Sequence, residues 1–153
     1  MTKFNNHIYM AYGSNLNKEM MKDRCPNAEP IGSAFFPDYR LCFKGVADMI
    51  PAKGFKIAVG LWRLTDACEL ALDRYEGFPH LYRKNFWKQG DTGNVYMAYL
   101  MNKKHFGPPS QAYFDCIADG YHDFKIPITH LNDALQHSYD EEMADPYVSK
   151  KWG

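Results

Sequence analysis

The order of extended and helical segments constrains the fold of this chain most. Short runs rich in Val, Ile, Tyr, Phe and Trp alternate with turn residues, and helical patterns are interspersed among them. We expect strands over 7–11, 31–36, 39–43, 55–64, 82–89 and 94–101. We expect helices over 16–24, 65–77, 108–120 and from about 127 onwards. Strands with short hairpin links and interspersed helices predict an α+β fold, in which the sheet can close on itself.

Length and composition indicate one self-sufficient core. The 153 residues show no repeat or low-complexity linker, so we expect 1–153 to form a single domain. A hydrophobic content of 46% argues against an intrinsically disordered chain. The 11 tyrosines are consistent with a Tyr-lined cleft, because a tyrosine suits a site with one apolar and one polar side.

Charge and cysteine usage exclude several classes of protein. Lys plus Arg equals Asp plus Glu, 18 against 18, which argues against a nucleic-acid binder; the Ser149-Lys150-Lys151 ending is too short to change this. The four cysteines match no zinc spacing, so we expect no metal site and reduced thiols in a cytoplasm. We find no signal segment and no apolar run long enough for a membrane span. We expect the 139–146 region to be an exposed tail.

The first candidate site follows the predicted strand 7–11. There, Gly13-Ser14-Asn15 forms a turn that opens a helix, so several backbone N–H groups are free to bind a carboxylate or a developing oxyanion. Gly13 allows a ligand to approach the backbone closely. The structural alternative is a tight turn in which Ser14 and Asn15 are only local caps.

The second candidate site is Glu76, which precedes Gly77 at a predicted helix end. A carboxylate there is disfavoured by the helix dipole, and the aromatic neighbours Tyr75 and Phe78 can raise its pKa further. Both effects suit a general base that works near neutral pH. The alternative is an exposed acid that pairs with a basic neighbour, namely Arg74, Arg83 or Lys84.

These two segments resemble the signatures of one enzyme family. Residues 12–16 read Y-G-S-N-L, and residues 72–77 read L-D-R-Y-E-G, which is similar to the second signature of the γ-glutamylcyclotransferase (AIG2-like) superfamily. Further similarity to bacterial members lies in 24–26, 39–43, 60–65, 109–113 and 120–121. Together these segments span 7–139 in the same order as in the family.

The resemblance implies a small β-barrel flanked by helices, with a cavity at one end. It implies that Glu76 is the catalytic acid/base and that the loop 9–16 holds the glutamyl group. The substrate-binding candidates are Tyr9, Tyr12, Gly13, Ser14, Asn15 and Leu16. Further candidate contacts are Tyr82, Tyr113 and His130, the last of which stands where some members place a tyrosine.

The implied reaction is an intramolecular acyl transfer that releases an amine and 5-oxoproline from a small γ-glutamyl compound. The nucleophile is the substrate's own amine, so no metal or organic cofactor is required. Three alternatives remain at this stage: an enzyme acting on another γ-glutamyl compound, such as γ-glutamyl-ε-lysine or a γ-glutamyl-protected intermediate; a non-catalytic module that binds a small ligand; and a partner-binding domain. The sequence leaves the oligomeric state undetermined.

Overall fold

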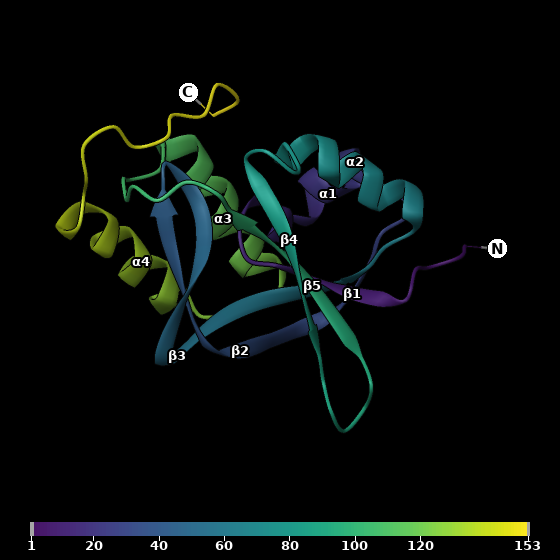
Figure 1. Ribbon diagram of the computed structural model, residues 1–153. Coiled ribbons are helices and arrows are strands. Elements are labelled where there is room, and N and C mark those ends of the chain that lie inside the picture. The colour runs from purple at the N-terminus through teal and green to yellow at the C-terminus, as the bar shows by residue number, and fades with distance from the viewer. Residues whose placement is uncertain (1, 153) are drawn as a thin grey trace.

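A five-stranded mixed sheet forms the centre of the molecule in the computed structural model, which describes residues 2–152 (Figure 1). Residues 1 and 153 of the expected domain lie outside the described residues. The strands are β1 (His7–Ala11), β2 (Glu29–Lys44), β3 (Val46–Arg63), β4 (Tyr82–Lys88) and β5 (Val95–Met101), in the order β2-β3-β1-β5-β4. β1 pairs antiparallel with β3 and parallel with β5, which places its C-terminal end at the middle of the sheet.

β2 and β3 form one long hairpin, where the sequence predicted shorter strands. The Pro37-Asp38 pair was expected to separate two strands, but β2 continues through it with a register shift, and Asp38 takes a φ of 63°. The Asp38 carboxylate accepts a hydrogen bond from the Gly54 amide opposite (3.0 Å), which fits a β-bulge rather than a strand end. β3 begins at Val46, nine residues before the predicted start.

The α+β class is confirmed, whereas the backbone pairing does not close the sheet. β2 and β4 are its two edges. The edges meet through aromatic rings instead: Trp87 of β4 lies 5.0 Å from the ring of Phe36 and 5.6 Å from that of Tyr39, both on β2. The sheet is thus curled by side-chain packing, without the hydrogen bonds of a closed barrel.

Each of the first three α-helices begins at a side-chain cap. Asn17 caps α1 (Lys18–Arg24), Thr65 caps α2 (Asp66–Glu76) and Ser110 caps α3 (Gln111–Asp123). α4 (Thr129–Asp140) packs on β2. The predicted helix 16–24 is divided: a short 3-10 turn, η1 (Ser14–Leu16), comes first, and α1 starts only at Lys18. No helix within 2–152 is long and apolar enough to cross a membrane.

One hydrophobic core joins the sheet to α3 and α4. Its largest fully buried side chains come from elements far apart in the chain: Met10, Leu16, Phe43, Ile57, Leu72, Met97, Ile117, Tyr121 and Leu131. All four cysteines are buried as free thiols. Because this core fixes the end of β1 against α2 and α3, it also fixes the loops that carry the two sequence signatures.

Candidate active site

The two sequence signatures meet in space, although about sixty residues separate them. The Asn15 side-chain amide lies 3.4 Å from Oε1 of Glu76, and Ser14 Oγ lies 3.4 Å from the Tyr75 hydroxyl. The end of β1 supplies one side of this contact, and the end of α2 supplies the other. The structure therefore brings the expected anion-binding turn and the expected base to one place.

Two adjoining hollows open at this contact, an inner one of about 270 Å³ and an outer one of about 350 Å³. Both are lined by Ser14, Glu76, Tyr82 and Tyr113. The inner hollow is completed by residues from β1, the following turn, β3 and β5, namely Tyr9, Tyr12, Gly13, Asn15, Ala47 and Tyr99. Five tyrosines thus line it, which agrees with the Tyr-rich composition.

Three of the five tyrosine hydroxyls of the inner hollow are held by backbone partners. Tyr12 donates to the Tyr99 carbonyl, and Tyr82 donates to the Ala47 carbonyl (2.6 Å). The Tyr113 hydroxyl accepts a hydrogen bond from the Ala47 amide (3.0 Å). Burial raises the pKa of Tyr12, Tyr82 and Tyr113 far above the ordinary value, so these rings stay neutral and form fixed walls rather than proton carriers.

Glu76 has the electrostatics of a base that titrates near neutral pH. Burial raises its pKa to about 7, while Arg24, Lys151 and the Asn15 amide act in the opposite direction. The side chain is only partly buried, so a substrate can reach it. A carboxylate with such a pKa can both take and return a proton at physiological pH.

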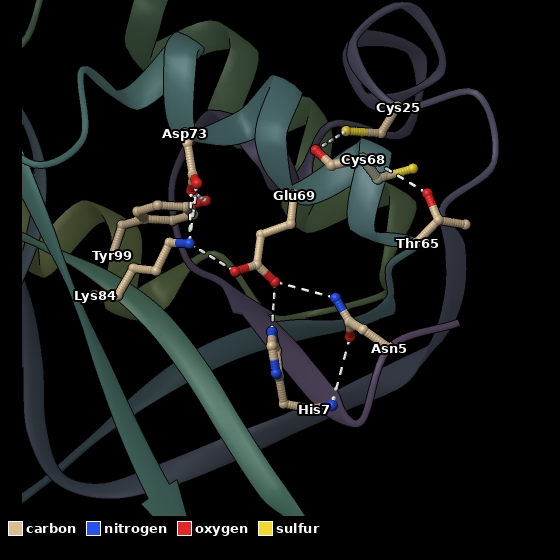
Figure 2. Close-up of polar contacts among 9 residues, drawn as sticks. All are labelled: Asn5, His7, Cys25, Thr65, Cys68, Glu69, Asp73, Lys84 and Tyr99. Atoms are coloured by element: carbon tan, nitrogen blue, oxygen red, sulfur yellow. Dashed lines mark hydrogen bonds and ion pairs between the residues drawn. The ribbon is translucent and has the colours of Figure 1, made fainter. Parts of the chain in front are cut away.

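Two of the three basic neighbours that could have paired with Glu76, Arg83 and Lys84, have other partners. Figure 2 shows Lys84 between Glu69 and Asp73, with its ammonium 2.6 Å from Glu69 Oε2 and 2.9 Å from Asp73 Oδ1. Arg83 donates to the Met101 carbonyl (2.9 Å). The ion pairs among residues 2–152 leave Glu76 without a cationic partner, which favours its reading as a base.

The same network fixes the helix that carries Glu76. Glu69 accepts hydrogen bonds from Asn5 (3.0 Å) and Lys84 and contacts His7 Nε2 at 2.5 Å, which ties α2 to the segment before β1, to β1 and to β4 (Figure 2). One turn further along α2, Asp73 accepts a hydrogen bond from the Tyr99 hydroxyl (2.6 Å). α2 ends at Gly77, whose φ of 66° is the left-handed cap that the sequence predicted.

Arg24 is a site residue that the sequence did not assign. Its guanidinium donates to Ser14 Oγ (3.2 Å), to the Asn15 side-chain oxygen and to the Tyr75 hydroxyl (2.6 Å). It also stacks 3.6 Å from the centroid of the Tyr75 ring. Two features of the sequence could have pointed to Arg24. It begins the segment 24–26 that resembles the family, and it ends the short helix α1, which follows the turn directly.

The turn at Gly13 and Ser14 lines the inner hollow and has backbone amides without a hydrogen-bond acceptor among the described residues. No acceptor within residues 2–152 bonds the N–H groups of these two residues, because η1 makes its first backbone bond from Leu16 to Gly13. A Cβ on Gly13 would lie 3.1 Å from the Tyr113 hydroxyl, so a glycine keeps this turn open. η1 has three residues, so anion binding would rely on these N–H groups rather than on a helix dipole.

Two candidate contacts lie away from the hollows. Leu16 has no exposed surface and packs against α3, where a Cβ on Gly120 would lie 2.6 Å from Leu16 Cβ; it is a core residue. His130 lies on α4 beside Phe35 of β2, with ring centroids 5.5 Å apart. Since α4 packs on β2, the structure does not bring His130 to the two hollows at Glu76.

The end of the chain, beyond the expected exposed tail 139–146, reaches the site. Lys151 and Trp152 line the outer hollow, and both contact Tyr75. These contacts could not be predicted locally, because a short basic segment has the same composition whether it packs on the protein or is free in solvent.

A larger hollow lies elsewhere, and no acidic side chain lines it. Its empty volume is about 920 Å³, and Lys88 is its only charged lining residue. The apolar and aromatic groups that line it include Phe36, Trp87 and Tyr96. The smaller hollows at Glu76 therefore remain the candidate active site.

The site thus pairs a turn that has free backbone amides with a glutamate whose pKa is raised by burial. The chain belongs to the γ-glutamyl cyclotransferase, AIG2-like family, whose model matches residues 9–121. No curated protein sequence matches the chain significantly.

Solved structures share the fold. A structure described as γ-glutamyl cyclotransferase is 24% identical with a TM-score of 0.71, and the match covers 95% of this chain and 94% of that one. An uncharacterised protein from Homo sapiens is 24% identical with a TM-score of 0.69, and the match covers 95% and 94%. YkqA from Bacillus subtilis is 23% identical with a TM-score of 0.69, and the match covers 92% of this chain and 56% of that one. At these identities the likeness concerns the fold.

Proposed function

We propose that this protein cyclises the γ-glutamyl group of a small γ-glutamyl amine or amide to 5-oxoproline and releases the amine. The glutamyl α-amine attacks the δ-carbonyl carbon, a new C–N bond closes a five-membered lactam, and the original amide C–N bond breaks. No water, metal or redox partner enters the balance.

Glu76 carries the proton in this proposal. The α-amine is mostly protonated at neutral pH and cannot attack in that state. The α-ammonium nitrogen gives up two protons as it becomes the lactam N–H, and the departing nitrogen takes up two as it leaves as an ammonium. The Glu76 carboxylate relays them one at a time, so the enzyme ends in its starting state. A pKa of about 7 suits both half-reactions.

The turn and the tyrosines position the substrate. The amides of Gly13 and Ser14 can hold the α-carboxylate or the developing oxyanion, with Arg24 one layer behind them. The walls formed by Tyr9, Tyr12, Tyr82, Tyr99 and Tyr113 favour a folded substrate that is ready to close its ring. Positioning of this kind can lower a barrier by about 7–11 kcal/mol at best.

The contact between Glu76 and the Asn15 turn, inside one hollow, is the observation that carries the proposal. A non-catalytic binding module would have no use for a raised-pKa carboxylate that faces an anion-binding turn. Four buried, reduced thiols fit a cytoplasmic location. A cytoplasmic location and a single domain are therefore part of the same proposal.

Replacing Glu76 by Gln tests the proposal. We expect Glu76→Gln to keep the fold and to lower 5-oxoproline release by roughly 10²–10⁴-fold, because the amide cannot accept the proton. The assay measures 5-oxoproline from a panel of γ-glutamyl compounds, including γ-glutamyl amino acids, γ-glutamyl-ε-lysine and γ-glutamyl alkylamines.

Glu19→Gln is the matched control, because Glu19 is an exposed acid on α1. It should retain wild-type turnover. Substantial turnover by a folded Glu76→Gln variant would exclude Glu76 as the base, and wild-type protein inactive on the whole panel would favour the binding module.

A further inference from the structure

The last residues of the chain form a strap across the site, defined here as residues 143–152. In Figure 1 this yellow segment leaves α4 and runs across the end of the molecule that also carries α2 and α3. It lies beyond residues 9–121, the part matched by the family model. The family model therefore says nothing about its contribution to the pocket.

The strap is docked on the loop that precedes α3 and on the tip of the β2–β3 hairpin. The Met143 amide donates to the Phe106 carbonyl (2.9 Å). At Gly107 an added Cβ would lie 2.5 Å from Pro146 Cβ, and at Gly45 an added Cβ would lie 1.8 Å from the Tyr147 carbonyl oxygen. Two glycines thus leave room for the strap.

The end of the strap forms the outer wall of the hollow at Glu76. Trp152 packs edge-on against Tyr113, with ring centroids 5.2 Å apart, and its indole N–H donates to the Tyr75 hydroxyl (3.2 Å). The Lys151 ammonium donates to the Tyr75 carbonyl and lies 4.0 Å from the Tyr75 ring centroid. That bond uses one of its three N–H groups, and Lys151 as a whole is exposed, so a ligand can reach the others.

The charges around the outer hollow are unbalanced. Arg24 and Lys151 both contact Tyr75, whereas Glu76 is the only carboxylate among residues 2–152 that lines either hollow. Burial lowers the pKa of Lys151, Glu76 raises it and Arg24 lowers it, so two cations share one carboxylate and an incoming anion would balance the second cation. A glutamyl group with its free amine is zwitterionic and leaves this imbalance in place.

We propose that the strap is a specificity element, in which Lys151 binds a carboxylate on the amine half of the substrate. This rests on the function proposed above. The inner hollow receives the glutamyl half, the scissile bond lies at Glu76, and the amine half extends into the outer hollow beneath Lys151 and Trp152. The substrate class is then a γ-glutamyl compound whose leaving amine carries a carboxylate.

Two probes that differ only in that carboxylate test the inference: γ-glutamylalanine and γ-glutamylethylamine. We expect the wild type to prefer γ-glutamylalanine in kcat/KM by about 10- to 100-fold, the effect of one charge-assisted contact. Lys151→Met keeps the apolar stem and should lose this preference, because kcat/KM falls for γ-glutamylalanine and stays unchanged for γ-glutamylethylamine. Lys151→Arg should retain most of the preference. Equal losses on both probes would show that Lys151 only caps α2, and a wild type without preference would also overturn the proposal.

Gly107→Ala tests the strap without changing a pocket residue. The new Cβ must displace Pro146, so we expect a reduced preference for γ-glutamylalanine. Gly90→Ala is the matched control, because a Cβ there meets no atom within 4 Å. A wild-type preference in Gly107→Ala would contradict the role of the strap.

Binding separates this inference from the proposed function. Calorimetry with Glu76→Gln should show tighter binding of γ-glutamylalanine than of γ-glutamylethylamine, and the added Lys151→Met change should abolish the difference. If wild type turns over neither probe but binding shows the Lys151-dependent difference, the proposed reaction fails and carboxylate recognition stands. Binding of neither probe overturns the inference.

Discussion

At the scale of a single residue, Glu76 links activity and stability to pH in opposite directions. Its pKa is raised from 4.5 to about 7, mainly by burial, so the folded protein holds this proton more tightly than the unfolded chain. The resulting stability is fully present below pH 4.5 and is lost as the pH rises through 7. Catalysis needs the carboxylate, so kcat/KM should fall about tenfold per pH unit below 7.

We therefore expect Glu76→Gln to be more stable than wild type at pH 8, with an upper limit of about 3 kcal/mol, and equally stable near pH 4. Urea unfolding at the two pH values measures the difference. A rate profile that stays flat down to pH 4, or a Gln variant that is less stable at pH 8, would contradict this account of the pocket.

At the scale of one element, α2 is held by its acidic side chains more than by its apolar stripe. Only Cys68 and Leu72 of its residues are buried, while Glu69 and Asp73 bind partners on β1, β4 and β5. Burial acts to raise the pKa of Glu69, but hydrogen bonds from Lys84 and His7 outweigh it and hold that pKa below the ordinary value. The network therefore stabilises above pH 4.5 and weakens as the pH falls through the lowered pKa.

Glu69→Gln should lower the free energy of unfolding by about 1–3 kcal/mol at pH 7, since it leaves partly buried donors without their charged acceptor. Chemical denaturation at pH 7 and pH 3 measures the loss, which should shrink at the lower pH. The exposed Glu19→Gln change should have little effect at either pH. An undiminished loss at pH 3 would mean that charge is not the cause.

At the scale of the whole molecule, a buried ion pair fixes the tip of the long hairpin against the rest of the sheet. Lys44 Nζ lies 2.7 Å from Asp48 Oδ2, and their side chains are 8% and 2% exposed. Lys44 also donates to the Lys103 carbonyl, and Asp48 accepts from the Met101 amide of β5 (2.8 Å). Ala47, between them, holds two of the site tyrosines, so this pair also positions the pocket.

Asp48→Ala should destabilise by about 3–5 kcal/mol, because it leaves a buried ammonium unpaired. The double variant Lys44→Met/Asp48→Leu should recover part of that loss, since no unpaired charge remains. Chemical denaturation of the single and double variants measures the coupling. A double variant less stable than Asp48→Ala would show that the pair itself, rather than the orphaned charge, supplies the stability.

Local interactions explain what could be predicted. The strands β1, β4 and β5 and the helix end at Gly77 follow from interactions within a few residues, and the predicted bounds of these strands agree with the structure to within one residue. The bulge at Asp38 could not be separated from a turn, because Pro-Asp has the same local preference in both.

The sequence by itself determined which two segments are the candidate site: the turn 12–16 and the helix end at Glu76 are marked by residue type and order, and the structure brings them together. Only the tertiary structure decided that Leu16 belongs to the core, that His130 faces the hairpin, and that Arg24 and Lys151 flank Tyr75. Those outcomes depend on contacts across 51 residues for Arg24 and 76 for Lys151. Such contacts form only when the whole core packs. The residues next to Arg24 or Lys151 in the sequence therefore do not show that Tyr75 will be the partner.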